Sequence, residues 1–428
     1  MKGRWYIVCL IFCLGMLVSG CREKEEIREP VTITLMHGWG GTLKNHQTMQ
    51  DIYRQFDEQN EDIVLEFQPF PDVTIAVEEA NNMLSVGKMP DIISTNGFSY
   101  YVENAVRRGM AMDLMSYIEA DEEFKEEISP AVFEAWESSG KLYTLPDAME
   151  VSGYWYNEDI FKKAGITDEK GDVDLPDTWD EFFRDCDRIE GWSKENGLDI
   201  TPFALENDQI VENFFFARLA GSEEGFSMTN TIPGDFAAKA VEETVKDTGR
   251  LLSYSHDVNN LDNARQFFAE GKCAIFFNGV WDSEYFRESS GAENIGYAAY
   301  PTEDGRSLAY VSPSAGYVVY NNQDVRKREA CVRFLKYMLS EEVQTELALK
   351  TGQAPVNPQV SGEEILQEYP LLGKGLQAAN RADVKIKTLR SVWTGSYGDV
   401  LADQLAGAAR DEKKLAPMLE DLNRIAEK

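Results

Sequence analysis

Apolar and polar residues follow two different periods along the first hundred residues. The segment 31–37 (VTITLMH) alternates as a half-buried strand does, whereas 43–59 has apolar residues three to four apart, as on one helix face. A strand at 64–68, a helix at 75–86 and a strand at 91–94 follow. Strands alternating with helices in this order form a parallel sheet with crossover helices, so the pattern predicts an α/β fold.

The middle and the end of the chain continue this alternation, with clear helix boundaries. Asn157 is typical of an N-cap, and Gly165 ends the helix that it opens. The sequence TWDE at 178–181 predicts a capping box for a further helix. A helix leading into a strand is expected over 262–277, and a helical pair over 400–428.

The first residues are typical of a secretory leader. Two basic residues precede an apolar run at 7–18, which is too short to span a bilayer. The run leads into VSGC, which resembles the lipobox of bacterial lipoproteins, where the cysteine carries a diacylglycerol. We therefore predict a signal peptide at 1–20, a lipidated Cys21, and a charged tether that completes the segment 21–30. An ordinary signal peptide with a chance cysteine is the alternative.

Composition narrows the possible partners. The chain has 428 residues, enough for two or three domains, and its 74 acidic and 42 basic residues give a net charge of −32. Such a chain is repelled by phosphate backbones, so nucleic acid is not expected as a partner. Apart from the leader and the lipidated Cys21, only Cys186, Cys273 and Cys331 remain, which implies no disulfide framework, and Cys273 and Cys331 fit a core.

Several catalytic and cofactor motifs are absent from the sequence. It has no dinucleotide-binding GxGxxG after a strand, no Walker A motif and no GxSxG nucleophile elbow. Its three histidines lack zinc-site spacing. We therefore expect neither a cofactor nor a metal. The acidic loop at 168–174 could hold calcium, but it lacks the EF-hand spacing, and a solvated surface loop is the favoured interpretation.

Three tryptophans stand beside glycine or asparagine just beyond predicted strands. They are Trp39 in HGWGG, Trp281 in FFNGVW and Trp393 in RSVWTGSYG. Open α/β sheets bind ligands beyond the carboxyl ends of their strands. A sugar ring offers an apolar face to an indole, and its hydroxyls need hydrogen-bond partners. The three tryptophans together favour a sugar-like ligand over rim-packed core aromatics.

Polar side chains that could meet such hydroxyls lie at comparable loop edges. They are Asn96 in STNG, Asp147 and Glu150 in PDAMEV, and Asn278 in FFNGVW. Turn or cap chemistry is at least as good an explanation for Asn96 and Asn278. Glu150 stands apart, because a carboxylate within an extended apolar stretch needs a specific partner.

Seven segments, in this order, resemble bacterial extracellular solute-binding proteins of the carbohydrate class, the ligand receptors of ATP-binding-cassette importers, with maltose-binding protein as a distant relative. They are TITLMHGWGG, GKMPDIISTNG, GKLYTLPDAMEVSGYWYNEDIFKKAGI, FFAEGKCAIFFNGVW, YVSPSAGYVVY, REACVRFLKYMLSEEVQ and LRSVWTGSY. The resemblance implies two lobes of a type II-like periplasmic binding protein that close as a hinged clamp. It divides the chain into an N-terminal lobe, 31–148 plus 315–358, and a C-terminal lobe, 149–314 plus 359–428.

The resemblance also assigns ligand contacts. Glu150 matches a sugar-binding glutamate, and Trp281 and Trp393 match stacking tryptophans. Glu206, in PFALEND, is a weaker match to a ligand carboxylate. Trp39 lies in a loop that often supplies polar or aromatic contacts. The sequence STNGF departs from the family pattern, which puts the contact at Asn96 in doubt.

The function implied is that of a monomeric, lipid-anchored sugar receptor on the outer face of the cell membrane, which serves a membrane permease and has no enzyme activity. One alternative is the same fold binding a peptide, a polyamine or a metal complex; Tyr100 and Tyr101 superficially resemble iron ligands, although helix packing is favoured. A second alternative is a glycosidase using Asp147 and Glu150. A sensory role without import is the third.

Overall fold

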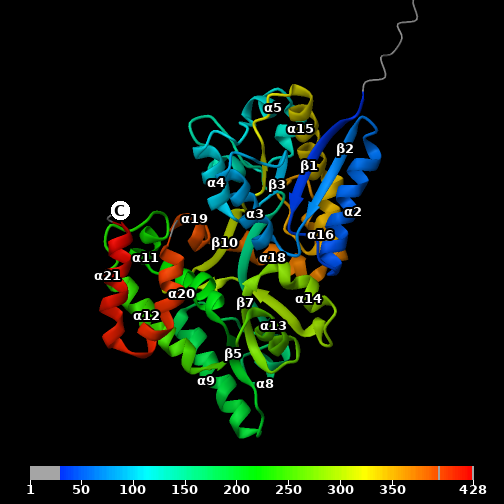
Figure 1. Cartoon of the computed structure of the whole chain (residues 1–428). Helices are drawn as coiled ribbons and strands as arrows, with labels where there is room; N and C mark the ends of the chain where they lie inside the picture. Colours follow the sequence, from blue (N-terminus) through cyan, green and yellow to red (C-terminus); the bar gives the residue numbers. More distant parts are fainter. Residues whose placement is uncertain (1–28, 394–395, 427–428) are drawn as a thin grey trace, which may run out of the picture.

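The computed structural model describes residues 29–393 and 396–426, and builds them into two lobes, each around its own sheet (Figure 1). The predicted signal peptide at 1–20, Cys21 and most of the tether lie outside the described residues. The α/β class predicted from the sequence is confirmed. In the described part of the chain, no helix is long and apolar enough to cross a bilayer.

The first lobe is built on a four-stranded sheet with the order β11-β3-β1-β2. Its strands are β1 (Val31–His37), β2 (Ile63–Pro69), β3 (Ile92–Ser94) and β11 (Tyr317–Val319). The first three are parallel, as their alternation with helices predicts, and β11 joins β3 antiparallel after a long excursion of the chain. The helices of this lobe are α2 (Lys44–Gln59), α3 (Val73–Ser85), α4 (Ser99–Arg107), α5 (Met115–Glu119), α6 (Glu122–Glu126), α7 (Pro130–Trp136), α15 (Val325–Leu339) and α16 (Glu341–Thr351).

The second lobe is built on an eight-stranded sheet, whose main path is β12-β10-β4-β7-β5-β6. Its strands are β4 (Met149–Asn157), β5 (Thr201–Leu205), β6 (Ser255–Asp257), β7 (Cys273–Gly279), β8 (Ile295–Ala298), β9 (Tyr300–Pro301), β10 (Ser307–Pro313) and β12 (Val384–Ile386). The helices before β10 are α8 (Glu158–Lys163), α9 (Trp179–Glu195), the π-helix η1 (Gln209–Phe215), α10 (Phe216–Ala220), α11 (Glu223–Met228), α12 (Lys239–Ser253), α13 (Leu261–Ala269), η2 (Val280–Asp282), α14 (Ser283–Arg287) and η3 (Ala292–Asn294). The later helices are α17 (Gly362–Glu368), α18 (Pro370–Arg381), α19 (Leu389–Val392), α20 (Tyr397–Arg410), η4 (Glu412–Lys414) and α21 (Leu415–Ala426).

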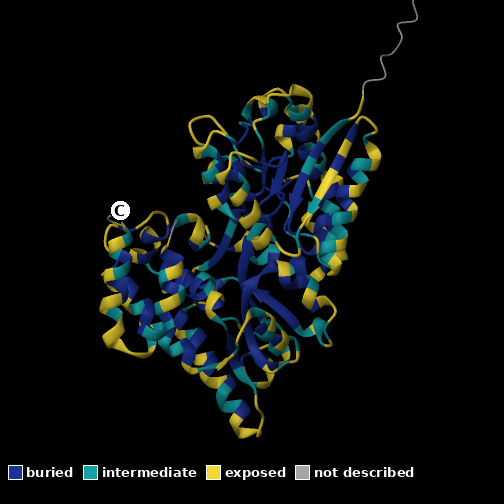
Figure 2. Cartoon of the chain, viewed as in Figure 1, coloured by how far each residue is buried: buried dark blue, intermediate teal, exposed yellow. Residues whose placement is uncertain are grey.

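Most strands of both sheets are buried, whereas β2 at the edge of the first sheet and the outer faces of the helices are exposed (Figure 2). The helix signals in the sequence act as predicted. The side chain of Asn157 accepts a hydrogen bond from the Ile160 amide, and Thr178 and Glu181 form the reciprocal capping box. Cys273 and Cys331 are buried, as their apolar surroundings predict, and neither forms a disulfide bond with another described residue.

Chain crossings between the sheets converge at one place. The backbone of Leu145 pairs with Tyr317 at the edge of the first sheet, and four residues later Met149 pairs with Pro313 in the second. A third segment, after α16, joins them, because the amide of Met149 donates to the carbonyl of Ala354. The two lobes therefore share a bundle of short, paired segments.

Gly316 tests how tightly these crossings pack. A Cβ at this position would lie 2.2 Å from the Leu145 carbonyl oxygen and 2.4 Å from the Pro146 Cα, and backbone atoms cannot give way as a flexible side chain can. We expect Gly316→Ala to lower the free energy of unfolding by about 2 kcal/mol or more, measured by urea denaturation. Gly234→Ala is the matched control, since nothing lies within 4 Å of its Cβ. Equal effects of the two substitutions would contradict tight packing at the crossing.

Candidate functional site

A cleft of about 550 Å³ lies where the two lobes meet beside the chain crossings. The first lobe contributes the loops after β1 and β3 and the start of α2. The second contributes the segment after β7, helix α14 and one residue of α13. The three crossings supply the remaining residues. Four of the seven predicted site residues line this cleft: Trp39, Asn96, Glu150 and Trp281.

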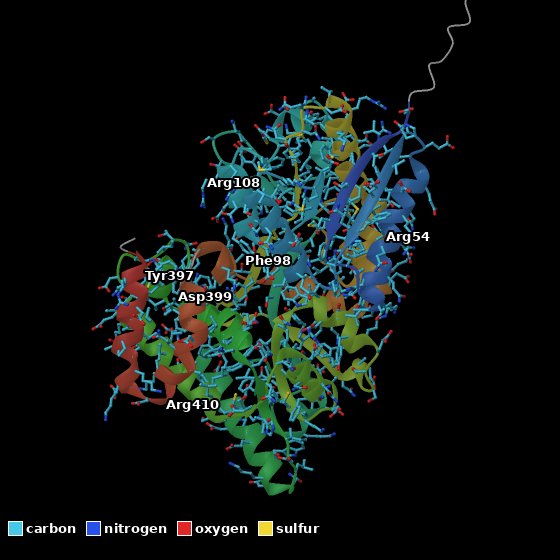
Figure 3. All side chains as sticks on the ribbon, viewed as in Figure 1. Arg54, Phe98, Arg108, Tyr397, Asp399 and Arg410 are labelled. Carbon is cyan, nitrogen blue, oxygen red and sulfur yellow. The ribbon has the colours of Figure 1, made fainter. Side chains whose placement is uncertain are left out.

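On the first lobe, local hydrogen bonds fix Trp39 and Asn96. The Trp39 amide donates to His37 Nδ1 at 3.1 Å, and its carbonyl accepts from Gln50 Nε2 at 2.6 Å. Asn96 has a φ of 42°, in the left-handed region that asparagine tolerates. The segment STNG therefore forms the turn that its residue types predict. Asn96 nevertheless faces the cleft. The next residue but one, Phe98, lies near the junction of the lobes (Figure 3).

On the second lobe, Trp281 lies on the surface of the cleft with 40% of its area exposed. Its ring covers Gly279, where any Cβ would lie 2.1 Å from the indole. The next residue holds the loop in place: buried Asp282 accepts from Asn278 Nδ2 at 2.7 Å and from Arg265 Nε at 2.9 Å. An apolar ring on an anchored loop is a preformed stacking surface.

Glu150 lies on β4 at the junction with the first lobe. Gly97, with a φ of 99°, covers it so closely that a Cβ there would lie 3.3 Å from Glu150 Oε1. Burial, together with the nearby charge of Glu212, raises the pKa of Glu150 to about 7. The Thr388 side chain acts in the opposite direction and limits this rise in the pKa of Glu150.

Three predicted contacts lie elsewhere in the structure. Asp147 is buried at the crossings, among the hydroxyls of Tyr53 and Tyr317, which are 3.0 Å apart, and burial raises its pKa. Glu206 accepts hydrogen bonds from the amides of Asp208 and Gln209 at 2.9 and 2.8 Å, which is helix-capping chemistry. Neither residue lines the cleft.

Trp393 is 1% exposed and also lies away from the cleft. Its indole N–H donates to the Met228 carbonyl at 2.9 Å, and the rings of Phe216 and Phe236 lie edge-on to it at 5.2 and 5.0 Å. Its glycine-rich surroundings suggested an exposed ring, but α19 ends one residue earlier and directs the indole into the core of the second lobe. We therefore leave Trp393 out of the candidate site.

Sequence reasoning missed several cleft residues. Tyr285, 45% exposed, lies four residues after Trp281 at the start of α14, and this helical spacing could have indicated it. Ser314 and Gln353 come from the crossings and carry no local signal. Their Oγ and Oε1 atoms are shielded from solvent and have no hydrogen-bond partner within the described residues. Such an oxygen costs about 1–3 kcal/mol, which a ligand donor could recover.

Ion pairs join the lobes at the edge of the cleft. Lys44, at the start of α2, lies 3.0 Å from Glu284 and 3.2 Å from Glu288. These carboxylates raise the pKa of Lys44. The lysine side chain is 56% exposed, so the pairs contribute little to stability.

The described residues hold no group of three or more histidine, cysteine, aspartate or glutamate side chains suited to a metal ion. In the acidic loop at 168–174, Asp168 Oδ1 accepts hydrogen bonds from the amides of Lys170 and Asp172 at 2.8 and 3.0 Å. The loop therefore satisfies its own carboxylate as an ordinary turn does. Of the tyrosine pair, Tyr101 is buried in α4 and Tyr100 is exposed.

The raised pKa of Glu150 has a consequence for stability. An unfolded glutamate loses its proton near pH 4.5, whereas folded Glu150 keeps it until about pH 7. The folded state thus holds the extra proton between these values, so its stability falls as pH rises from 5 to 8. We expect Glu150→Gln to reduce this fall, measured as melting temperature against pH, and the exposed Glu169→Gln to leave it unchanged. Parallel curves for wild type and Glu150→Gln would contradict the prediction.

Curated relatives match most of the chain. A protein of Brucella abortus is 25% identical over 343 residues, which cover 77% of this chain and 76% of that one. The multiple sugar-binding protein of Streptococcus mutans is 22% identical over 360 residues, covering 78% and 79%.

Solved structures share the fold. A Streptococcus pneumoniae solute-binding protein in complex with the blood group A-trisaccharide superposes with a TM-score of 0.76 at 23% identity, covering 92% of this chain and all of that one. A maltose-bound protein of T. maritima superposes with a TM-score of 0.70 at 19% identity, covering 92% and 100%. Residues 51–374 match the family of bacterial extracellular solute-binding proteins, and the chain belongs to that family.

Proposed function

We propose that this protein is the substrate-binding component of an ATP-binding-cassette importer, and that it binds a sugar or oligosaccharide in the cleft and delivers it to a membrane permease. One observation supports this most strongly: the exposed rings of Trp281 and Tyr285 share a cleft with the polar groups of Asn96 and Glu150. Aromatic faces suit the apolar side of a sugar ring, and the polar groups suit its hydroxyls.

The proposed mechanism is closure of the lobes on the ligand. We take 31–148 plus 315–358 and 149–314 plus 359–428 as the two bodies, with the paired crossings as the hinge. A sugar between Trp39 on one lobe and Trp281 on the other would contact both bodies only when they are closed. Binding would therefore shift the population towards the closed form.

A glycosidase reading finds less support. Such an enzyme needs two carboxyl groups flanking one bond of the substrate. Glu150 lines the cleft, but Asp147 lies beneath it among tyrosine hydroxyls. The relatives that match the chain are binding proteins of the same family, which favours binding without turnover.

A thermal-shift screen against mono- and oligosaccharides, peptides, polyamines and ferric citrate tests the ligand class. A sugar at about a thousand times its Kd would add about 4 kcal/mol of stability.

We expect Trp281→Ala to weaken binding about thirtyfold or more and to leave the melting temperature of the free protein nearly unchanged, since the ring is exposed. Trp393→Ala should instead lower the free energy of unfolding by about 3–5 kcal/mol, because its ring is buried.

Two outcomes would contradict the proposal. If only a peptide, a polyamine or ferric citrate stabilised the protein, the fold assignment would stand but the ligand would not be a sugar. Release of product from a bound oligosaccharide would show an enzyme.

The lipid anchor forms part of the proposal. VSGC ends an apolar run of leader length, so we expect Cys21 to carry the lipid and to hold the protein on the outer face of the membrane. Cells expressing Cys21→Ser should lose incorporation of labelled palmitate into the protein, and the protein should leave the membrane fraction. Cys186→Ser is the control, since that thiol is buried in the second lobe. Persistent labelling of Cys21→Ser would refute the anchor.

A further inference from the structure

Carboxylates outnumber cationic side chains in the lining of the cleft. Its lining includes two cationic side chains and twice as many carboxylates. The cations are Lys44 and Arg265, and the carboxylates are Glu150, Asp282, Glu284 and Glu288. A ligand that enters therefore meets an excess of negative charge in a space partly withdrawn from water, where charges are screened weakly.

Both cations are already engaged. Lys44 bridges Glu284 and Glu288. Arg265 has its Nε and Nη2 2.9 Å from Asp282 and its Nη1 on Asp262, and its guanidinium lies 5.4 Å from the centre of the Tyr285 ring. Asp282 is buried, so releasing Arg265 to a ligand would leave that carboxylate unpaired at high cost.

Glu150 is different, because among the described residues only burial, the Thr388 side chain and the charge of Glu212 act on its pKa, and none of these is a cation. Glu212, whose charge acts on Glu150, is itself paired with Arg390 at 2.7 Å. Gly97 covers one side of Glu150. An ionised carboxylate only accepts hydrogen bonds, so its partner in the cleft must be a donor.

We infer that the cleft selects sugars without anionic groups, and that Glu150 is the residue that determines this specificity. The inference rests on the proposed sugar-binding function and narrows it. Hydroxyl and ammonium groups can donate to Glu150, whereas a uronic acid, a sialic acid or a sugar phosphate brings a like charge and finds no free cation. Rejection of the wrong ligand by like charge is a common source of specificity.

The test compares each sugar with a charged derivative of nearly the same size. Maltotriose, cellotriose and raffinose are each measured beside the form whose primary hydroxyls are oxidised to carboxylates, by titration calorimetry at pH 8. For any trisaccharide that binds, we expect its carboxylate form to bind at least about a hundredfold more weakly. This comparison needs no variant.

Glu150→Gln then separates charge from shape. It keeps the size of the side chain and removes its charge, so the difference between the neutral and oxidised sugars should shrink at least about tenfold. Glu169→Gln, far from the cleft lining, should keep the full difference. An oxidised sugar that binds wild type within threefold of its neutral partner would overturn the inference. So would a difference that Glu150→Gln leaves intact, since shape would then explain it. If none of the sugars bound, the proposed function, on which this inference depends, would be refuted instead.

Discussion

The pairing of two segments that cross between the sheets is the constraint from which the site follows. The segments before β4 and after β10 run in opposite directions between the sheets and are paired at both ends, by Leu145–Tyr317 at the first sheet and by Met149–Pro313 in the second. A one-residue slip in such a ladder would turn each side chain to the opposite face. The register that sets Glu150 opposite Ser312 therefore also decides that Glu150, and not its neighbours, meets the loop of the first lobe.

Around this crossing, polar groups are divided between structure and cleft. Asp147, three residues before Glu150, is buried among tyrosine hydroxyls, while its carbonyl accepts from Gln344 Nε2 at 2.9 Å. The same short segment thus supplies one carboxylate that is buried at the chain crossings and one that faces the cleft. Burial raises the pKa of both carboxyls. Burying them therefore costs free energy, which the rest of the fold offsets.

The sequence predicted the parallel order of β1, β2 and β3, the helix caps and the family, because these depend on local periodicity, caps and short motifs. The candidate site was predicted only in part. Trp281 follows a strand and stays exposed, whereas Trp393 follows a four-residue helix that directs it into the core. Both have similar neighbours in the sequence, so only the tertiary path separates them. Ser314 and Gln353 reach the cleft through chain crossings, which no local pattern encodes.

The ion pairs between Lys44 and the two glutamates of the opposite lobe contribute little free energy to holding the two lobes together. An exposed pair of this kind contributes less than about 1 kcal/mol, not far above thermal energy. It can align the lobes without locking them together. In the proposed clamp mechanism, the lifetime of the closed form would then depend on the contacts that the ligand makes, and the protein would reopen readily once the ligand leaves.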